Sequence, residues 1–279
     1  MPELPEVETV KNGIALFIGN ARILSVEITN RKFRITIPEN TEKNIVGAKI
    51  ENYQRIGKYV VINLDNDFCI VWHLGMSGKI KTLKEPPLHL EKHDHIVIKT
   101  ENGWLVYNDP RRFGLFTTIK KKDINKSEIF KNTGIDPFDN NLTGELFFEK
   151  IKNKKTPIKI TLLDQSVVCG IGNIYASEIL YESRISPFRE SNKIDKKECD
   201  ILVKNIRTVL QKAIDNGGST LRDYQKPDGS LGYFQNMHCV YNKTGQRCPD
   251  CTCNIELTGG IKKAVQAGRS TFYCETLQK

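Results

Sequence analysis

The spacing of apolar residues changes once along the chain, and that change limits the possible folds more than any other feature. Between residues 22 and 119 the apolar residues form short β-branched runs, separated by turn pairs such as Asp65-Asn66 and Asn102-Gly103. Beyond residue 141 they recur at helical spacing. Strands followed by helices predict an α+β fold in which an antiparallel β-sandwich or barrel precedes a helical region. The expected strands are 23–26, 33–37, 59–64, 69–72, 95–98 and 104–107.

Helices are expected at both ends of this sheet region. An apolar stripe of Val7, Val10, Ile14 and Phe17 predicts an amphipathic helix over 6–17. The later helices are expected at 146–151, 158–163, 174–180 and 199–214. The stretch 132–141, rich in Gly, Pro, Asp and Asn taken together, is predicted to be an interdomain linker, and the polar stretch 219–235 an exposed, mobile loop.

Charge and cysteine content restrict the class of protein. The 279 residues carry a net charge of +9, which favours a polyanionic partner, nucleic acid first and an anionic membrane surface second. No apolar run reaches the roughly 18–20 residues of a transmembrane helix, and the acidic N-terminus is unlike a signal peptide. Five of the eight cysteines lie within 239–274, which favours metal ligation in a reducing cytoplasm over disulfides.

The first six residues contain a possible nucleophile beside two acids. Removal of Met1 would leave Pro2 as a free secondary amine, and Glu3 and Glu6 follow it. An unprotonated amine attacks electrophilic carbon, and neighbouring carboxylates transfer protons. The alternative is purely structural, because proline and acidic residues are also typical of the first turn of a helix.

Three further motifs suit contacts with a nucleic acid. Lys58 begins an apolar strand, and a glycine-rich turn at 73–78 contains His73 and Met76. The turn at 109–114 places Arg111 and Arg112 beside Phe113. Arginine binds phosphates or base edges, and an exposed apolar side chain can enter the base stack. Each motif alone is more typical of an ordinary surface turn, and only together do they indicate a surface that binds DNA and opens a base step.

The helical region contains a possible anion site. Gly170-Ile171-Gly172-Asn173 precedes an expected helix, so its backbone N–H groups and the Asn173 amide could bind a phosphate. A tight corner between two helices would have the same sequence.

Taken together and in order, these motifs resemble the bacterial formamidopyrimidine-DNA glycosylase family. The resemblance spans nearly the whole chain, and Leu4 favours the branch acting on oxidised purines over the pyrimidine branch, which typically begins PEGPE. The matching segments are PELPE at 2–6, Lys58, HLGMSG at 73–78, DPRRFG at 109–114, LLDQ with GIGNIYASE at 162–178, and GRSTFYC at 268–274.

The resemblance implies an activity and a role for each motif. A monomeric enzyme would excise 8-oxoguanine and formamidopyrimidines from duplex DNA through a Schiff base on Pro2, and would then cut the strand by β,δ-elimination. Glu3 would transfer protons, Glu6 would help to hold the flipped base, and Lys58 would bind a phosphate near the lesion. Void-filling side chains would be Met76, Arg111 and Phe113, and phosphate-binding residues would be His73, Arg112, Asn173, Tyr241 and Arg269. The 219–235 loop would close over the extruded purine.

The implied architecture has three parts. They are an N-terminal β-sandwich domain with an N-terminal helix at 1–132, a helix-two-turns-helix domain at 133–236, and a C-terminal zinc-finger hairpin at 237–279.

The zinc finger departs from the family pattern. Cys248, Cys251 and Cys274 match three zinc ligands, but Leu277 occupies the position of the fourth cysteine. Either Cys253 or Cys239 replaces that ligand, or the site binds zinc weakly, or the hairpin folds without metal.

Two other functions fit the sequence less well. A catalytically silent protein that binds damaged DNA would not need Pro2, Glu3, Glu6 and Lys58 together. An RNA-binding module would need an aromatic platform for single-stranded bases, and no such motif is present in the sequence.

Overall fold

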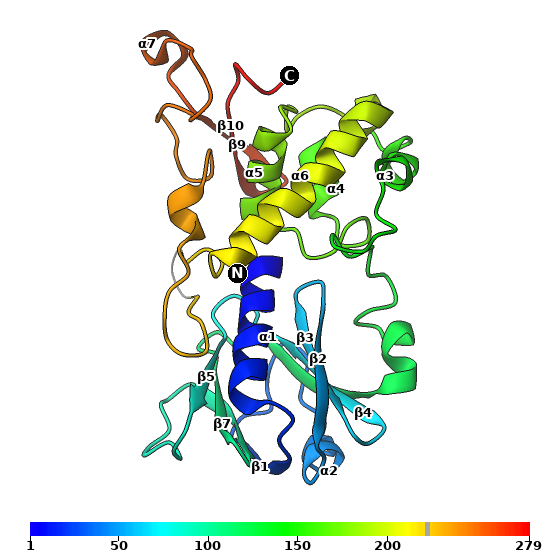
Figure 1. Ribbon diagram of the computed structural model, residues 1–279, viewed down its shortest axis with the longest axis vertical. Coiled ribbons are helices and arrows are strands. Elements are labelled where there is room, and N and C mark those ends of the chain that lie inside the picture. Colours follow the sequence, from blue (N-terminus) through cyan, green and yellow to red (C-terminus); the bar gives the residue numbers. More distant parts are fainter. Residues whose placement is uncertain (221–223) are drawn as a thin grey trace. The chain divides into compact units, whose positions relative to one another are not determined.

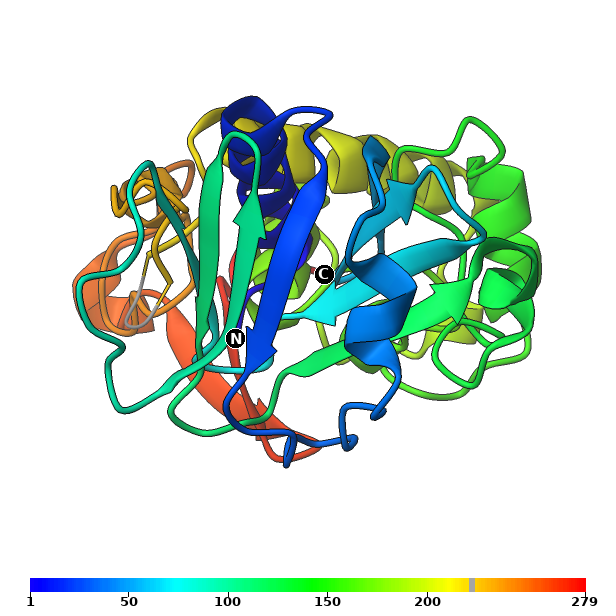
Figure 2. The ribbon, with the colours of Figure 1, turned by 90° about the horizontal axis from the view of Figure 1, so that it is seen from below.

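Two four-stranded antiparallel sheets face each other in the N-terminal part of the chain (Figures 1 and 2). The structure is a computed structural model and describes residues 1–220 and 224–279. One sheet has the order β1-β6-β7-β5 and the other β2-β3-β4-β8. The strands are β1 Ile23–Ile28, β2 Ile50–Ile56, β3 Tyr59–Leu64, β4 Phe68–His73, β5 Lys79–Leu83, β6 Asp94–Thr100, β7 Gly103–Asn108 and β8 Leu115–Lys120.

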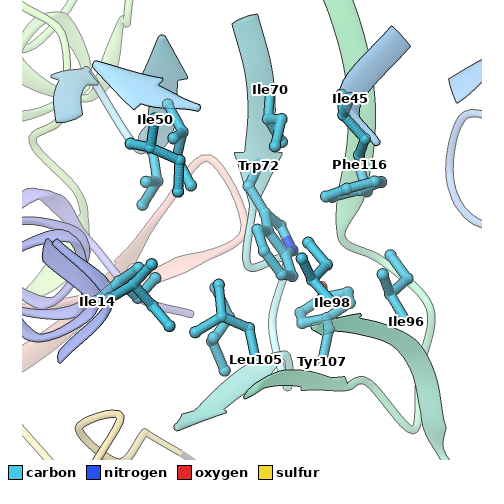
Figure 3. Packing of buried hydrophobic residues seen from close by; sticks show 14 of the residues in the cluster. Ile14, Ile45, Ile50, Ile70, Trp72, Ile96, Ile98, Leu105, Tyr107 and Phe116 are labelled. Atoms are coloured by element: carbon cyan, nitrogen blue, oxygen red, sulfur yellow. The ribbon is translucent and has the colours of Figure 1, made fainter. Parts of the chain in front are cut away.

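The core lies between these sheets. Trp72 and Phe116 come from one sheet, Leu105 and Tyr107 from the other, and Ile14 from helix α1 closes one side (Figure 3). The Trp72 ring meets the rings of Tyr107 and Phe116 edge-on, with centroids 5.2 and 4.8 Å apart. The predicted β-sandwich is therefore confirmed.

Helix α1, Leu4–Ile18, is fixed mainly by its apolar stripe. Val7, Val10 and Ile14 of the predicted stripe are buried, and Ile18 is buried in place of Phe17, which is only partly buried. Each buried side chain contributes about 1.5–3 kcal/mol. An N-terminal cap adds only about 1 kcal/mol. The helix contacts β2, β3 and β5, so it carries the N-terminal residues onto the sandwich.

The prediction of a strand over 33–37 is wrong. The Ile37 N–H donates to the carbonyl of Arg31 at 3.0 Å, which closes the segment into a loop, and Arg34 and Ile35 are exposed. Strands β2, β5 and β8 were not predicted, because polar residues interrupt their apolar ones and leave no continuous apolar run.

The chain divides into two compact units. The first contains Met1–Lys131 and Ala213–Gln235, and the second contains Asn132–Lys212 and Asn236–Lys279. Short helices in the first unit are α2 Thr41–Ile45 and η1 Lys121–Lys126. Within the described residues, no helix has the length and apolar character needed to span a bilayer.

The second unit is helical with a C-terminal β-hairpin, as predicted. Its helices are α3 Gly144–Ile151, α4 Ile158–Leu163, α5 Asn173–Glu182, η2 Ser191–Lys193 and α7 Ile255–Thr258, and its hairpin strands are β9 Lys262–Gln266 and β10 Arg269–Tyr273. Two helices, α6 Lys196–Asp215 and η3 Phe234–Met237, have residues in both units. The buried face of α6 is the predicted one, formed by Leu202, Ile206, Val209, Leu210 and Ala213.

Candidate functional site

The acidic residues at the start of α1 are buried and hydrogen-bonded. Glu3 is the N-cap residue, and its N–H donates to Glu6 Oε2 at 2.8 Å. Glu6 Oε1 accepts the N–H of Ser219 at 2.7 Å. Pro2, Glu3 and Glu6 are all buried. The chain therefore brings a proline, two carboxylates and the residue-219 backbone together, although 213 residues separate Glu6 from Ser219.

A glycine is required where this backbone passes Glu6. Gly218 has φ +76°, and a Cβ there would lie 2.8 Å from Glu6 Oε1. The Thr220 N–H donates to Gln235 Oε1, and the Gly232 N–H donates to Thr220 Oγ1, both at 2.9 Å. These bonds hold the two ends of the 219–235 segment together.

The 219–235 segment was predicted to be exposed, and this is wrong for several of its residues. Ser219, Tyr224 and Phe234 are buried. Burial raises the pKa of Tyr224 well above its usual range, and its hydroxyl donates to the carbonyl of Gly217 at 3.2 Å. The predicted mobility concerns in part residues 221–223, which lie outside the described residues.

Lys58 lies in the turn between β2 and β3 and is only 8% exposed. Gly57, with φ +57°, forms the turn before it. Arg55 Nη1 donates to the carbonyl of Gly57 at 3.2 Å, and Arg55 Nε pairs with Glu8 Oε2 on α1 at 2.9 Å. The Glu8–Arg55 pair thus ties the Lys58 turn to the helix that carries Glu3 and Glu6.

His73, at the end of β4, is a neutral imidazole near pH 7. Burial, followed by the charges of Lys58 and Arg34, lowers its pKa to about 4. Its Nδ1 accepts the N–H of Gly75 at 2.9 Å, so the ring proton is on Nε2. His73 can therefore offer a ligand a neutral N–H hydrogen-bond donor at Nε2. Arg34, which the sequence analysis missed, places an exposed guanidinium within electrostatic reach of this ring.

Large side chains protrude from the two glycine-containing turns. Met76 is 40% exposed and Phe113 is 47% exposed. The guanidinium carbon of Arg111 lies 4.6 Å from the centroid of the Phe113 ring, a cation–π contact. Arg112 is exposed and has φ +53°, a left-handed conformation uncommon for a residue with a side chain.

In the second unit, a buried lysine joins Asn173 to the hairpin. Asn173 begins α5, and its Nδ2 donates to the carbonyl of Ser270 at 2.9 Å. The fully buried Lys159 donates to Asn173 Oδ1, the Ser270 carbonyl and Thr271 Oγ1 at 2.8, 2.9 and 2.8 Å. Arg269, exposed beside Ser270, is thereby held near Asn173. The sequence singled out Asn173 and Arg269 but not Lys159.

A buried carboxylate fixes the backbone at Tyr241. Glu178, on α5, accepts the N–H groups of Cys239, Val240 and Tyr241 at 2.6, 3.0 and 2.7 Å. The Tyr241 ring packs against Phe272 of β10, with centroids 4.9 Å apart. Glu178 was also missed as a functional residue, although it ends the GIGNIYASE motif.

Three cysteines form a possible metal site. The sulfur atoms of Cys248, Cys251 and Cys274 lie within 4.8 Å of one another, and all three residues are buried. Such spacing suits thiolates around one ion, since Zn–S bonds of about 2.3 Å place tetrahedral ligands somewhat under 4 Å apart. Leu277 packs against this cluster.

Neither alternative fourth cysteine joins the group. Among the described residues, the three cysteines have no further His, Cys, Asp or Glu ligand atom within the same distance. Cys253 Sγ lies 3.6 Å from Thr258 Oγ1, and Cys239 Sγ lies 3.6 Å from Glu182 Oε1. The proposed replacement by Cys253 or Cys239 is therefore wrong for this structure.

Comparison with known proteins agrees with these features. Residues 1–116 match the formamidopyrimidine-DNA glycosylase N-terminal domain, and residues 133–225 match the formamidopyrimidine-DNA glycosylase H2TH domain. The formamidopyrimidine-DNA glycosylases of Wolbachia (from Brugia malayi) and Zymomonas mobilis are each 41% identical to this chain, with both sequences covered completely.

Solved structures show the same likeness. The Lactococcus lactis Fpg in complex with an abasic site containing DNA has a TM-score of 0.89 and 35% identity, over 99% of each chain. The same TM-score and identity, over all of both chains, are found for the wild-type L. lactis protein in complex with a N7-benzyl-Fapy-dG containing DNA.

Proposed function

Because the chain belongs to the formamidopyrimidine-DNA glycosylase family, we propose that it acts in base-excision repair as a bifunctional glycosylase and lyase for oxidised purines in duplex DNA. The observation that carries this proposal is the arrangement at the start of α1, where Pro2 lies beside two buried carboxylates. The 8-oxoguanine and formamidopyrimidine bases are the substrates, and abasic sites are substrates of the lyase step.

Pro2 is the nucleophile. In the full sequence Met1 acylates its nitrogen, so catalysis requires removal of Met1. The freed secondary amine attacks C1′ of the damaged nucleotide, and the base departs with the electrons of the glycosidic bond and gains a proton. Ring opening of the sugar leaves an iminium between Pro2 and C1′. Loss of the 3′ and then the 5′ phosphate by β- and δ-elimination cuts the strand on both sides of the sugar.

The two carboxylates have different roles. Glu3, adjacent to the amine, transfers protons at the sugar. Glu6 binds two backbone N–H groups, those of Glu3 and Ser219, so it holds the helix start against the 218–220 backbone. Through that contact Glu6 shapes the pocket for the flipped base. Lys58, buried and tied to α1 through Arg55 and Glu8, binds a phosphate near the lesion.

The remaining sequence-predicted residues bind the duplex. His73, Arg112, Asn173, Tyr241 and Arg269 contact phosphates, and Met76, Arg111 and Phe113 fill the space left by the extruded base. Their exposure on ordered turns supports this assignment for Met76 and Phe113. We propose the same three functional parts as the sequence analysis, 1–132, 133–236 and 237–279.

The three cysteines would hold a structural zinc ion. Cys248, Cys251 and Cys274 fit such an ion in sulfur chemistry, burial and spacing, and a hydrophobic leucine stands where a fourth ligand is usual. When bound, zinc would cross-link the turn at 248–251 to the end of the hairpin. It plays no part in the chemistry at Pro2.

A catalytically silent DNA-binding protein is the alternative, and borohydride trapping separates the two. The untagged protein is mixed with a duplex containing 8-oxoguanine opposite cytosine, reduced with borohydride, and mapped by mass spectrometry. We expect a covalent adduct on Pro2. The controls are a duplex with unmodified guanine and a protein whose N-terminus is blocked by a tag, and neither should form the adduct. Tight binding without an adduct would favour the silent binder.

A further inference from the structure

The turns that carry Met76 and Phe113 are joined by one buried carboxylate. We infer that Asp109 is a positioning residue that makes residues 73–78 and 109–114 a single rigid insertion unit. The inference rests on the proposed function, because it concerns how the void-filling side chains are presented to DNA. Asp109 itself is fully buried and does not reach a substrate.

The Asp109 carboxylate accepts hydrogen bonds from both turns. Ser77 Oγ, from the first turn, donates to Oδ1 at 2.7 Å. The Gly114 N–H, from the second turn, donates to Oδ2 at 2.9 Å, and the Arg111 N–H approaches Oδ1 at 3.3 Å. Tyr107 adds its hydroxyl at 3.3 Å from Oδ2. A carboxylate has about four acceptor positions, and four donors lie within 3.3 Å of these two oxygens.

The backbone of Asp109 is fixed in the same way. Its N–H donates to the carbonyl of His93 at 3.0 Å, and its own carbonyl accepts the N–H of Arg112 at 3.2 Å. The same carbonyl accepts Nε2–H of the buried His95 at 3.1 Å. Every polar atom of Asp109 therefore has a partner, and the residue cannot turn without breaking several bonds at once.

Glycines allow the two turns to touch. A Cβ on Gly75 would lie 2.4 Å from the nitrogen of Gly114. A Cβ on Gly114 or Gly78 would lie 1.9 or 2.4 Å from the Tyr107 hydroxyl oxygen. No side chain fits in these positions. The Tyr107 hydroxyl is thus enclosed by both turns while its ring belongs to the sandwich core (Figure 3).

In this arrangement the residues that hold the two turns together differ from the residues that would insert into DNA. The inner residues Ser77, Asp109 and Gly114 are buried, whereas Met76 and Phe113 protrude from the same two turns. Rigidly held side chains open a base step more readily than mobile ones. The reason is that a preorganised group loses little conformational freedom when it inserts. Asp109 therefore affects the opening of a stacked duplex and not the chemistry at the sugar.

The test compares two substrates in Ser77→Ala and Asp109→Asn proteins. Asparagine replaces one acceptor oxygen with an N–H₂ group that faces other donors. The insertion step is followed by stopped-flow fluorescence of 2-aminopurine, placed in the complementary strand beside 8-oxoguanine in a duplex. The chemical step is followed by borohydride trapping on a single-stranded abasic oligonucleotide, which has no base stack to open.

Control variants make the same two substitutions elsewhere in the sandwich. Ser25→Ala changes an exposed serine of β1, and Asp94→Asn changes a buried carboxylate that binds Asn108 at 2.8 Å and contacts neither turn through its side chain. Thermal unfolding of all four variants shows whether each is folded at the assay temperature.

We expect insertion to slow about tenfold in Ser77→Ala and more in Asp109→Asn, the effect of losing one or more well-formed hydrogen bonds from a preorganised site. Trapping on the single strand should stay within about twofold of the wild type. An equal loss in both assays, or no loss in either, would overturn the inference. Failure of the wild-type protein to form any adduct would instead reject the proposed function.

Discussion

At the scale of single residues, buried polar groups organise the regions around the candidate site. Lys159 is fully buried and directs its ammonium to three acceptors, which matches its three N–H donors. Glu178 binds three backbone N–H groups. A buried polar group left without its partner costs about 1–3 kcal/mol, and more when charged. These residues therefore fix the local backbone conformation, and this fixes the positions of the exposed residues beside them.

His73 should make the protein sensitive to acid. Its pKa is about 4 in the folded chain against an ordinary value of 6.5, so the unfolded chain binds more protons between these values. The stability that His73 contributes is complete above about pH 6.5 and is lost as the pH falls toward 4. His73→Asn keeps an acceptor for the Gly75 N–H but cannot be protonated.

Urea unfolding at pH 7 and pH 5 measures this effect. On going from pH 7 to pH 5, we expect the free energy of unfolding to fall by about 1–2 kcal/mol more in the wild type than in His73→Asn. His89→Asn, at an exposed histidine, is the control and should follow the wild type. An equal loss of stability in the wild type and His73→Asn would show that His73 is already protonated at pH 5.

At the scale of elements, the sequence predicted what depends on local pattern and missed what depends on pairing. The apolar stripe of α1 and the bounds of α4 follow from spacing within a few residues. The loop at 33–37 has the apolar content of a strand but no neighbouring strand with which to pair in the described chain. Composition alone contains no information about that neighbour.

The candidate site shows the same limit. Pro2, Glu3 and Glu6 were singled out because they lie within five consecutive residues. Asp109 and Lys159 were not, because their partners lie 32 and 111 residues away, at Ser77 and at Ser270. The spacing of residues in one sequence does not indicate which distant residues will form hydrogen bonds between loops.

Leu277 should determine how firmly the hairpin element binds zinc. The protein as it stands should contain about one zinc per chain that a chelator removes readily, because three thiolates would hold it where four are usual. Leu277→Cys supplies the missing fourth thiolate and should slow removal at least about tenfold, which corresponds to about 1.4 kcal/mol. Metal content by atomic emission and release to a chromogenic chelator measure both quantities.

A cysteine introduced elsewhere provides the control. Leu24→Cys adds a thiol on the exposed side of β1 and should leave the release rate unchanged. The hairpin end is also held by Gln278, which accepts the Cys274 N–H at 2.7 Å and donates to the carbonyl of Ile185 at 2.9 Å. Undiminished DNA binding by a chain shown to contain no zinc would mean that such contacts suffice without metal.

At the scale of the whole molecule, the net charge of +9 provides affinity for a polyanion but does not select a lesion. Each compact unit supplies candidate phosphate contacts of its own: Lys58, His73 and Arg112 in the first, and Asn173, Tyr241 and Arg269 in the second. Only the cationic members of this set release counterions from DNA. The neutral imidazole of His73, whose pKa is about 4, would bind a phosphate without doing so.

This difference predicts two kinds of binding defect. The logarithm of the association constant falls with the logarithm of salt concentration by about 0.9 for each phosphate neutralised. Arg269→Gln should therefore weaken binding and make that slope shallower by about 0.9. His73→Asn should weaken binding while leaving the slope unchanged.

Titration of an abasic-site duplex between about 50 and 200 mM salt separates these effects, because the range lies where phosphate contacts dominate affinity. A slope reduced equally by both substitutions would mean that DNA binds His73 as an imidazolium, and that the phosphate raises its pKa enough to offset burial and the charges of Lys58 and Arg34.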